Sequence, residues 1–115
     1  MPYVQVRVSV SLDSDQIKTL QKALSSAITL ILGKTPAVTM LEIIPNCNIY
    51  LGKYEDGDCA LVDIAVNNTP DKEDLVSYSK AVCNILNEVT GIKKERMYLT
   101  HRSNPEWHTG RMFLD

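Results

Sequence analysis

The chain has 115 residues, of which 44% are hydrophobic and 23% charged, and its formal net charge is -2. These values are typical of one soluble globular domain and argue against an intrinsically disordered chain. The sequence has no run of basic residues and no aromatic-basic cluster, so we expect no nucleic-acid partner. No apolar run is long enough for a membrane span, and the first ten residues alternate where a signal peptide would be continuously apolar. We therefore expect a cytoplasmic protein with no membrane partner.

The three cysteines of the chain are Cys47, Cys59 and Cys83. Their number is odd, and they show neither Cys-x-x-Cys nor the spacing of zinc ligands, which argues against a disulfide framework and a structural metal. We therefore expect free thiols and no metal site.

The first predicted element is a strand over residues 3–10, "YVQVRVSV", in which every second residue is valine. Such alternation is typical of a half-buried strand. Pro2 stands directly before this strand, at a position where the N–H that proline lacks is not needed. Pro2 also allows a chemical interpretation: if Met1 is removed, Pro2 carries a free secondary amine.

The next predicted element is a helix within residues 12–34, where apolar residues recur at helical spacing. Asp13 and Gln16 are placed for a capping box at its start. Gly33 is placed to end it.

Two further segments lie between this helix and the middle of the chain. Residues 37–44, "AVTMLEII", predict a second strand that ends before Pro45. Residues 48–52, "NIYLG", predict a short extra strand, which the polar turn "KYEDGD" follows.

The same pattern returns 58 residues later. The valines of the first strand and the glycine that ends the first helix have counterparts at this offset, namely Val62, Ile64, Val66 and Gly91. The agreement of strand, helix and glycine at one offset indicates an internal repeat. We interpret the chain as a single domain, residues 1–115, with two β-α-β pseudo-repeats at about 2–58 and 59–115.

In the second repeat, Thr69 is placed to cap a helix whose first residue is Pro70, and residues 96–100, "RMYLT", predict the closing strand. A right-handed crossover in each repeat places both helices on one face of a four-stranded mixed sheet, so we expect an α/β (α+β) fold. The other face is left uncovered. Apolar residues there would expose a large patch, and we therefore expect a homo-oligomer.

With this organisation the sequence resembles the tautomerase superfamily, and most closely the macrophage migration inhibitory factor (MIF)-like family. The resemblance covers essentially the whole chain. It is carried by the order and spacing of "MP", "LGKTP", "IIPN", "YLGK", "CALVDI", "SYSK" and "RMYLT". Members of the family are trimers with three active sites at subunit interfaces, so the resemblance implies a homotrimer.

The resemblance also implies a cofactor-independent keto-enol tautomerase for phenylpyruvate-like substrates, in which the amine of Pro2 is the general base. An α-amine titrates at about pH 7.7 to 8.0, and an apolar pocket or a nearby cation lowers this pKa. A base whose pKa lies near the working pH suits removal of a proton next to a carbonyl group.

Three further site residues follow from the same resemblance. Lys34 matches a lysine that contacts the carboxylate or carbonyl oxygen of the substrate, although a lysine behind a helix can also simply complement the helix dipole. Asn67 falls where the family offers a backbone amide to the substrate, but the usual glycine after it is replaced by Asn68. Tyr98 matches a tyrosine that reaches into the pocket of a neighbouring subunit, and the alternative is a tyrosine packed in the trimer core.

The C-terminal segment departs further from the family, although Trp107, Gly110 and Phe113 resemble its ending. His101 and His108 are more typical of structural or solvated histidines than of acid-base groups. The Cys-x-x-Cys motif linked to thiol exchange is absent, because Val62 stands where the second cysteine would be.

Two alternatives to the tautomerase remain open at this point. One is a cytokine-mimic binding protein with a vestigial pocket, which would bind a host receptor and leave the cell without a leader. The other is a hydratase or dehalogenase on the same scaffold, which would need an arginine and a carboxylate beside Pro2. The candidates for that pair are Arg7, Arg111 and Glu42.

Overall fold

Four strands form one sheet in the order β2-β1-β3-β4. The strands are β1 (Tyr3–Val8), β2 (Met40–Ile44), β3 (Ala60–Val66) and β4 (Met97–Ser103). β1 and β2 are parallel, β3 and β4 are parallel, and the central pair β1 and β3 is antiparallel. The computed structural model describes residues 2–53 and 57–112 of the chain. The mixed four-stranded sheet is therefore confirmed.

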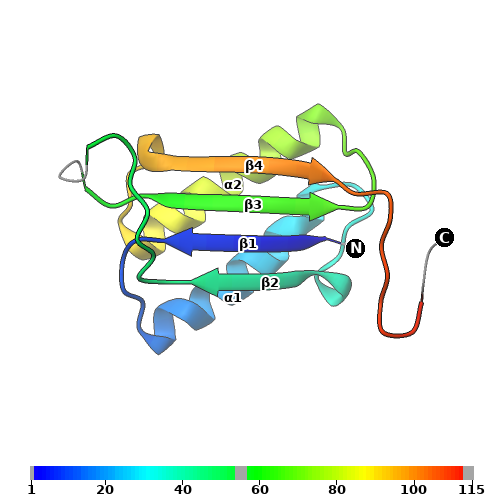
Figure 1. Ribbon diagram of the computed structural model, residues 1–115, viewed down its shortest axis with the longest axis horizontal. Helices are drawn as coiled ribbons and strands as arrows, with labels where there is room; N and C mark the ends of the chain where they lie inside the picture. Colours follow the sequence, from blue (N-terminus) through cyan, green and yellow to red (C-terminus); the bar gives the residue numbers. More distant parts are fainter. Residues whose placement is uncertain (1, 54–56, 113–115) are drawn as a thin grey trace.

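Two helices, α1 (Ser14–Ala27) and α2 (Lys72–Thr90), lie side by side behind the sheet. Figure 1 shows both on one face, with the opposite face turned to the viewer. The described residues also contain the short 3₁₀ helices η1 (Ile28–Leu30), η2 (Pro36–Val38) and η4 (Lys94–Arg96). The prediction of two β-α-β units with both helices on one face is confirmed.

Both units have the same internal register. Val4 of β1 lies opposite Leu41 of β2, and 58 residues later Val62 of β3 lies opposite Leu99 of β4. The helices follow the same offset, since buried positions of α1 recur as buried positions of α2: Leu20, Leu24, Tyr78 and Val82. The two halves thus build the core in the same way.

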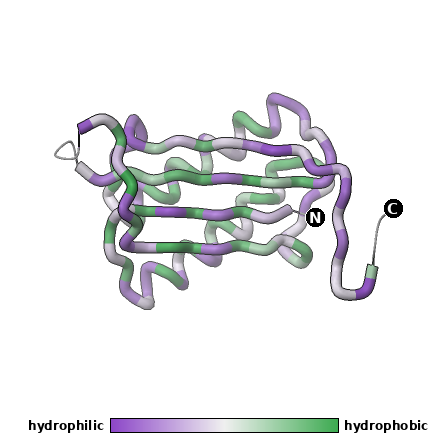
Figure 2. The backbone as a smooth tube through the Cα atoms, viewed as in Figure 1, coloured by the Kyte–Doolittle hydropathy of each residue, from purple (hydrophilic) through white to green (hydrophobic). Residues whose placement is uncertain are grey.

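The core lies between the sheet and the two helices. Figure 2 shows hydrophobic and hydrophilic residues alternating along β1, and the hydrophobic ones, Val4, Val6 and Val8, are buried. Alternation turns every second residue of a strand toward the helices. Burial of these apolar side chains is the main stabilising contribution to the fold.

The first helix begins at the predicted capping box and ends before the predicted stop at Gly33. The backbone N–H of Gln16 donates to Asp13 Oδ1 over 2.8 Å, and that of Asp13 donates to Gln16 Oε1 over 2.9 Å, so the capping box is confirmed. The helix ends at Ala27, and η1 tightens the chain there. Gly33 lies in the turn that follows, with a φ of +82° that favours glycine.

Three other element predictions need correction. α2 begins at Lys72 with Asp71 as its N-cap residue, and the hydroxyl of Thr69 donates to Ser103 Oγ over 3.4 Å instead of capping a helix. β2 begins at Met40 and not at residue 37, because η2 occupies the chain before it. Residues 48–52 form no strand.

The open face of the sheet is more polar than expected. Its middle row consists of polar residues from the four strands: Glu42, Gln5, Asp63 and Thr100. Arg102 forms an ion pair with Asp63 over 2.7 Å on this face. The expectation of an apolar patch was therefore wrong for the centre of the face, because the inward-outward alternation leaves polar residues there. Apolar residues remain at its ends, where Met40 and Tyr98 are exposed.

Candidate active site

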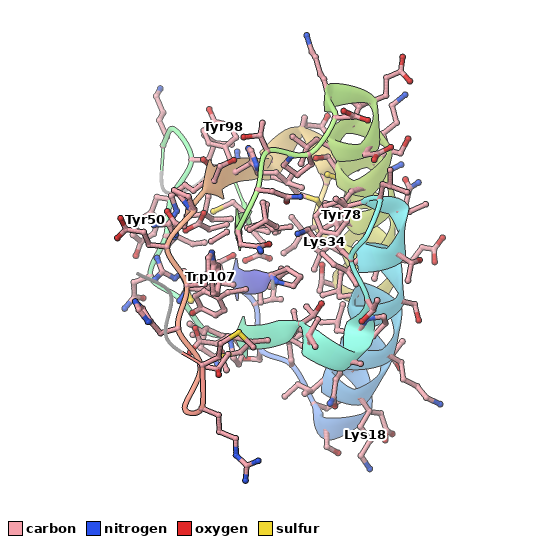
Figure 3. The ribbon with its side chains drawn as sticks, turned by 90° about the vertical axis from the view of Figure 1, so that its right-hand side faces the viewer. Lys18, Lys34, Tyr50, Tyr78, Tyr98 and Trp107 are labelled. Atoms are coloured by element: carbon pink, nitrogen blue, oxygen red, sulfur yellow. The ribbon has the colours of Figure 1, made fainter. Side chains whose placement is uncertain are left out.

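A cavity of about 1080 Å³ opens at the end of the sheet where β1 begins. Its walls come from the start of β1, from β2 with the residues just before it, and from the segment after β4. The lining residues are Pro2, Tyr3, Val38, Met40, Leu41, Glu42, Ile43, Trp107, His108, Thr109 and Gly110. Figure 3 looks onto this end of the molecule.

Pro2 forms part of the wall and is buried. Its carbonyl oxygen accepts a hydrogen bond from the N–H of Met40 over 3.0 Å, which extends the parallel pairing of β1 and β2. This bond fixes the residue against β2 without needing the N–H that proline lacks. Met1 and its removal lie outside the described residues.

Lys34 is a buried cation, with 8% of its surface exposed. Its Nζ donates a hydrogen bond to Oδ1 of Asn67 over 2.8 Å. The turn that contains Gly33 delivers it to this position, and its own N–H donates to the carbonyl of Ile31 over 3.0 Å. A buried ammonium is held in place when a polar oxygen pairs with it.

Asn67 connects Lys34 to the start of β1. Tyr3 lies opposite Ala65 in the antiparallel pair of β1 and β3, so Asn67, two residues further along, follows β3 at the end of the sheet where Pro2 lies. The structure therefore brings Pro2, Lys34 and Asn67 to one end of the sheet. In Figure 3, Lys34 lies on the helix side of the start of β1 and Trp107 on the other side.

The contact between Lys34 and Asn67 adds a role that the sequence did not indicate. The prediction for Asn67 concerned its backbone amide, and the backbone role stays a prediction. The side-chain amide, by contrast, accepts a hydrogen bond from the lysine. An asparagine can orient the ammonium while leaving its charge unneutralised.

Tyr98 is not brought to this cavity within one chain. It lies near the start of β4, paired with Leu61, and Leu61 in turn lies opposite Arg7 near the far end of β1 from Pro2. Its side chain is 62% exposed, and that of nearby Tyr50 is 67% exposed. The prediction that Tyr98 completes the site of a neighbouring copy stays a prediction.

The cavity contains a carboxylate, Glu42, that sequence reasoning considered only for a hydratase. Its Oε1 accepts hydrogen bonds from the hydroxyl of Tyr3 and from Nε2 of Gln5, each over 2.7 Å. These two donors, the tyrosine first, lower the pKa of Glu42. The same bond to the carboxylate raises the pKa of Tyr3. Only the strand register could have revealed that Glu42 accepts these two hydrogen bonds, because Glu42 lies 39 positions from Tyr3 and 37 from Gln5.

Trp107 provides the largest aromatic wall of the cavity. Its indole nitrogen is buried and has no hydrogen-bond partner among the described residues. The sequence indicated this tryptophan only through the resemblance of the C-terminal segment. Phe113, the other aromatic residue of that ending, lies outside the described residues.

An arginine does not join Glu42 in the described part of this cavity. Arg7 shares a row of the open face with Ile44 and Leu61, away from Pro2. Arg111 is exposed in the C-terminal segment and does not line the cavity. The charge of Arg7 helps to lower the pKa of Glu42, but neither arginine lines the cavity with the carboxylate, as a hydratase or dehalogenase would need.

The described residues offer neither a metal site nor a membrane-spanning helix. They contain no group of three or more His, Cys, Asp or Glu side chains placed to hold a metal ion. No helix in the described ranges is both long and apolar enough to cross a membrane. Cys47, Cys59 and Cys83 are free thiols, as predicted.

A chain with this fold and this cavity belongs to the macrophage migration inhibitory factor (MIF) family, whose family model matches residues 1–112. Among curated proteins no sequence match is found. The identification therefore depends on the family model, with the solved structures supporting the fold.

Solved structures share the fold at low sequence identity. MIF2 of Leishmania major is 21% identical with a TM-score of 0.89, covering 99% of this chain and 97% of its own. A MIF homologue of Prochlorococcus marinus is 22% identical with a TM-score of 0.82, covering 97% of this chain and 99% of its own. Pt0534, solved after inactivation by 2-oxo-3-pentynoate, is 18% identical with a TM-score of 0.79, covering 96% of this chain and 94% of its own.

Proposed function

We propose that this protein is a cofactor-independent keto-enol tautomerase that acts on phenylpyruvate-like 2-oxo acids and uses the amine of Pro2 as its general base. The observation that carries the proposal is the position of Pro2 in the wall of the large cavity, at the same end of the sheet as the buried cation Lys34, in a MIF-family chain. The proposal requires that Pro2 is the first residue of the working protein.

The reaction can be written with these residues. The neutral amine of Pro2 takes a proton from the carbon next to the carbonyl group of the substrate, and the electron pair of that C–H bond forms the C=C bond of an enolate. The charge moves to the carbonyl oxygen, where the ammonium of Lys34 stabilises it. The proton then returns from Pro2 to the oxygen, which gives the enol without net gain or loss of atoms.

Two features support this assignment of roles. Burial of Pro2 and the ammonium of Lys34 at the same end of the sheet both favour the neutral amine, which is the form that accepts a proton. The amide of Asn67 holds the ammonium, so the electrophile is positioned before the substrate arrives. In the proposed homotrimer, Tyr98 of a neighbouring copy adds an aromatic wall to the site. We further propose that the enzyme acts in the cytoplasm.

The first experiment combines the intact mass of the purified protein with the rate of phenylpyruvate enol-keto conversion in the same sample. We expect a mass that lacks Met1 and a rate that Pro2→Gly lowers at least about a hundredfold, as for loss of an acid-base group. Pro70→Gly is a matched control, because Pro70 lies before α2 and outside the cavity.

The outcomes separate the candidate functions. A trimmed, folded protein without turnover would contradict the phenylpyruvate assignment and favour the alternative of a cytokine-mimic binding protein with a vestigial pocket. Binding to a host receptor that survives Pro2→Gly would favour that alternative further. Full turnover in Pro2→Gly would contradict the role of Pro2 as base.

A covalent label tests Pro2 independently of the substrate. Pt0534 is inactivated by 2-oxo-3-pentynoate, an alkyne conjugated to a 2-oxo acid. In this chain, the Pro2 nitrogen would add to the alkyne, and the amine proton would move to the neighbouring carbon, so the whole reagent is retained. We expect the protein to gain one reagent mass per chain at Pro2, and Pro2→Gly to be labelled much more slowly.

A further inference from the structure

A second, smaller pocket lies at the other end of the sheet, and the proposed reaction does not use it. Its volume is about 230 Å³, and it lies where β4 begins. The exposed aromatic side chains of Tyr50 and Tyr98 form part of its lining, together with Cys59 and Arg96. We call it the Tyr98 pocket, and the cavity beside Pro2 the Pro2 cavity.

The Tyr98 pocket is the counterpart of the Pro2 cavity in the second repeat. For seven of its eight lining residues, the residue 58 positions away lines the Pro2 cavity. The eighth, Cys59, corresponds to residue 1, which lies outside the described residues. The related pairs include Pro2 and Ala60, Val38 and Arg96, and Met40 and Tyr98.

The sheet shows the same two-fold relation. Exchange of the two repeats leaves the strand order β2-β1-β3-β4 unchanged when it is read from the other edge. In the central antiparallel pair, Val4 lies opposite Ile64, and their counterparts Val62 and Val6 also lie opposite each other. The two pockets are therefore equivalent places, one at each end of the sheet.

The groups of the proposed reaction are absent from the second of these places. Ala60 stands where the first repeat has Pro2, and a residue inside the chain carries no free amine. Ile92 stands where the first repeat has Lys34, and it is buried. The Tyr98 pocket therefore has the shape of the site without its chemistry.

Contacts within the chain fix the walls of the Tyr98 pocket. Arg96 Nη2 donates to the carbonyl oxygen of Leu51 over 3.1 Å, and Arg96 Nε donates to that of Asp58 over 2.9 Å. The thiol of Cys59 donates to the carbonyl oxygen of Ile49 over 3.3 Å. Because these walls are ordered in advance, a side chain that enters the pocket has little ordering cost to offset.

We propose that the Tyr98 pocket receives the side chain of Met40 from a neighbouring copy of this chain. The inference rests on the proposed function, in which Tyr98 of one copy reaches the Pro2 cavity of the next. The two surfaces that meet there are related by the repeat, so each contact has a counterpart in the opposite direction, as in a two-fold symmetric interface. The counterpart of Tyr98 is Met40, and the counterpart of the Pro2 cavity is the Tyr98 pocket.

Met40 suits this role in exposure, size and chemistry. Its side chain is 69% exposed in the single chain. The pocket of about 230 Å³ has room for it, since a cavity of about 150 Å³ is enough to hold benzene. A methionine is unbranched, and its sulfur makes favourable contacts with aromatic rings such as those of Tyr50 and Tyr98.

The contact also connects assembly with the position of Pro2. Met40 lines the Pro2 cavity of its own copy, and its N–H donates to the carbonyl oxygen of Pro2 over 3.0 Å. A Met40 side chain anchored in the next copy fixes the start of β2 beside Pro2. Met40 is thus an interface residue and a positioning residue for the proposed base.

Cross-linking tests the contact directly. Met40 is replaced by the photoreactive amino acid photo-leucine in the full chain, and isotopically labelled and unlabelled chains are unfolded together and refolded in equal amounts. We expect irradiation to join residue 40 to residues 49–51 or 59–61. About half of these products should join a labelled to an unlabelled chain, because neighbours in the ring are drawn at random.

Association of variants, measured by sedimentation equilibrium, tests the contribution of the side chain. We expect Met40→Asp to weaken association at least about a hundredfold, because a carboxylate would lose its water in the pocket. Met40→Leu should stay within about threefold of the parent, since the apolar volume is kept. Leu32→Asp is the matched control and should leave association unchanged, because Leu32 is 81% exposed and lines neither pocket.

A double-mutant cycle assigns the effect to the Tyr98 pocket. Met40→Ala and Leu51→Ala together should weaken association less than the product of their separate effects, because both remove the same contact. Met40→Ala and Leu32→Ala should act independently. Unfolding temperatures of all variants show whether a change in association reflects a change in folding.

The inference is overturned if residue 40 cross-links elsewhere or not at all, if Met40→Asp associates like Leu32→Asp, or if the unmodified protein is a monomer. Phenylpyruvate turnover, measured in parallel, keeps the two proposals apart. The expected cross-link without turnover would contradict the tautomerase and support the Met40 contact. Turnover by an assembly whose residue 40 cross-links elsewhere would contradict the Met40 contact alone.

Discussion

At the scale of single residues, the hydroxyl of Tyr78 is the clearest polar group in the core that the fold does not satisfy. The side chain is 1% exposed, and its oxygen has no hydrogen-bond partner among the described residues. Burial raises the pKa of this tyrosine far above its usual value. An unpaired buried hydroxyl costs free energy, whereas the ring around it contributes to packing.

We expect Tyr78→Phe to raise the free energy of unfolding by about 1 kcal/mol, because it removes the unsatisfied oxygen and keeps the ring. Urea denaturation measures the change, and Tyr50→Phe, at an exposed tyrosine, is the control that should leave stability unchanged. The difference should widen above about pH 10, the ordinary pKa of tyrosine.

The direction of that pH dependence follows from proton binding. Above its ordinary pKa, Tyr78 loses its proton in the unfolded chain and keeps it in the folded one, so the unfolded state binds fewer protons and stability falls as pH rises. The Tyr78→Phe variant has no ionisable group at this position, so this fall in stability at high pH is absent from it. A variant that is clearly less stable than the parent at neutral pH would show that the hydroxyl has a partner after all.

The site residues differ in how visible they are in the sequence. Pro2 and Lys34 could be proposed because they lie in "MP" and "LGKTP", two of the motifs that carry the family resemblance. Glu42 and Trp107 could not be placed, because their contribution depends on which strand and which segment lie beside Pro2. The contact of Asn67 with Lys34 likewise depends on a turn and a strand end that are 33 residues apart.

At the scale of elements, the two helices start with the same residue type and different hydrogen bonding. Asp13 accepts a hydrogen bond from the N–H of Gln16 at the start of α1. Asp71 holds the same position before α2, but its side chain makes no capping hydrogen bond. The two helices therefore allow an N-cap residue that forms a capping hydrogen bond to be compared with one that does not.

We expect Asp13→Ala to lower the free energy of unfolding by about 1 kcal/mol, the usual contribution of an N-cap side chain. Asp71→Ala should cost clearly less, and what remains is its charge near the helix N-terminus. Equilibrium denaturation of both variants tests this, and equal losses would show that charge, not the capping bond, stabilises the start of α1.

Elements with strong local sequence patterns could be predicted, whereas elements that depend on pairing with a distant strand could not. The alternation of β1 and the capping box of α1 are local patterns, and both are confirmed. Residues 48–52 have strand-like composition, yet a strand also needs a partner strand, and these residues pair with none of the four strands of the sheet. The carbonyl groups of Ile49 and Leu51 instead accept hydrogen bonds from the side chains of Cys59 and Arg96.

At the scale of the whole molecule, the residues proposed for the site lie at the two ends of the sheet. Pro2 and Lys34 lie where β1 begins, and Tyr98 lies toward the other end with its side chain exposed. One chain cannot bring these groups together without breaking the sheet. The proposed homotrimer would do so, because a neighbouring copy can place its Tyr98 end against the Pro2 end of the first.

This arrangement predicts that two defective proteins can complement each other. Pro2→Gly removes the base, and Tyr98→Ala removes the aromatic wall of a neighbour's site, so each variant alone should have strongly reduced phenylpyruvate turnover. When the two are unfolded together and refolded in equal amounts, about a quarter of the sites should combine an intact Pro2 with an intact Tyr98 from the next copy. Light scattering should give a mass near three chains of 12.9 kDa for each sample.

Because Tyr98 and Pro2 of one chain lie far apart, recovered activity requires that they meet across an interface. A trimer without complementation would assign Tyr98 to packing between the copies, and a monomer with full activity would contradict the shared site altogether.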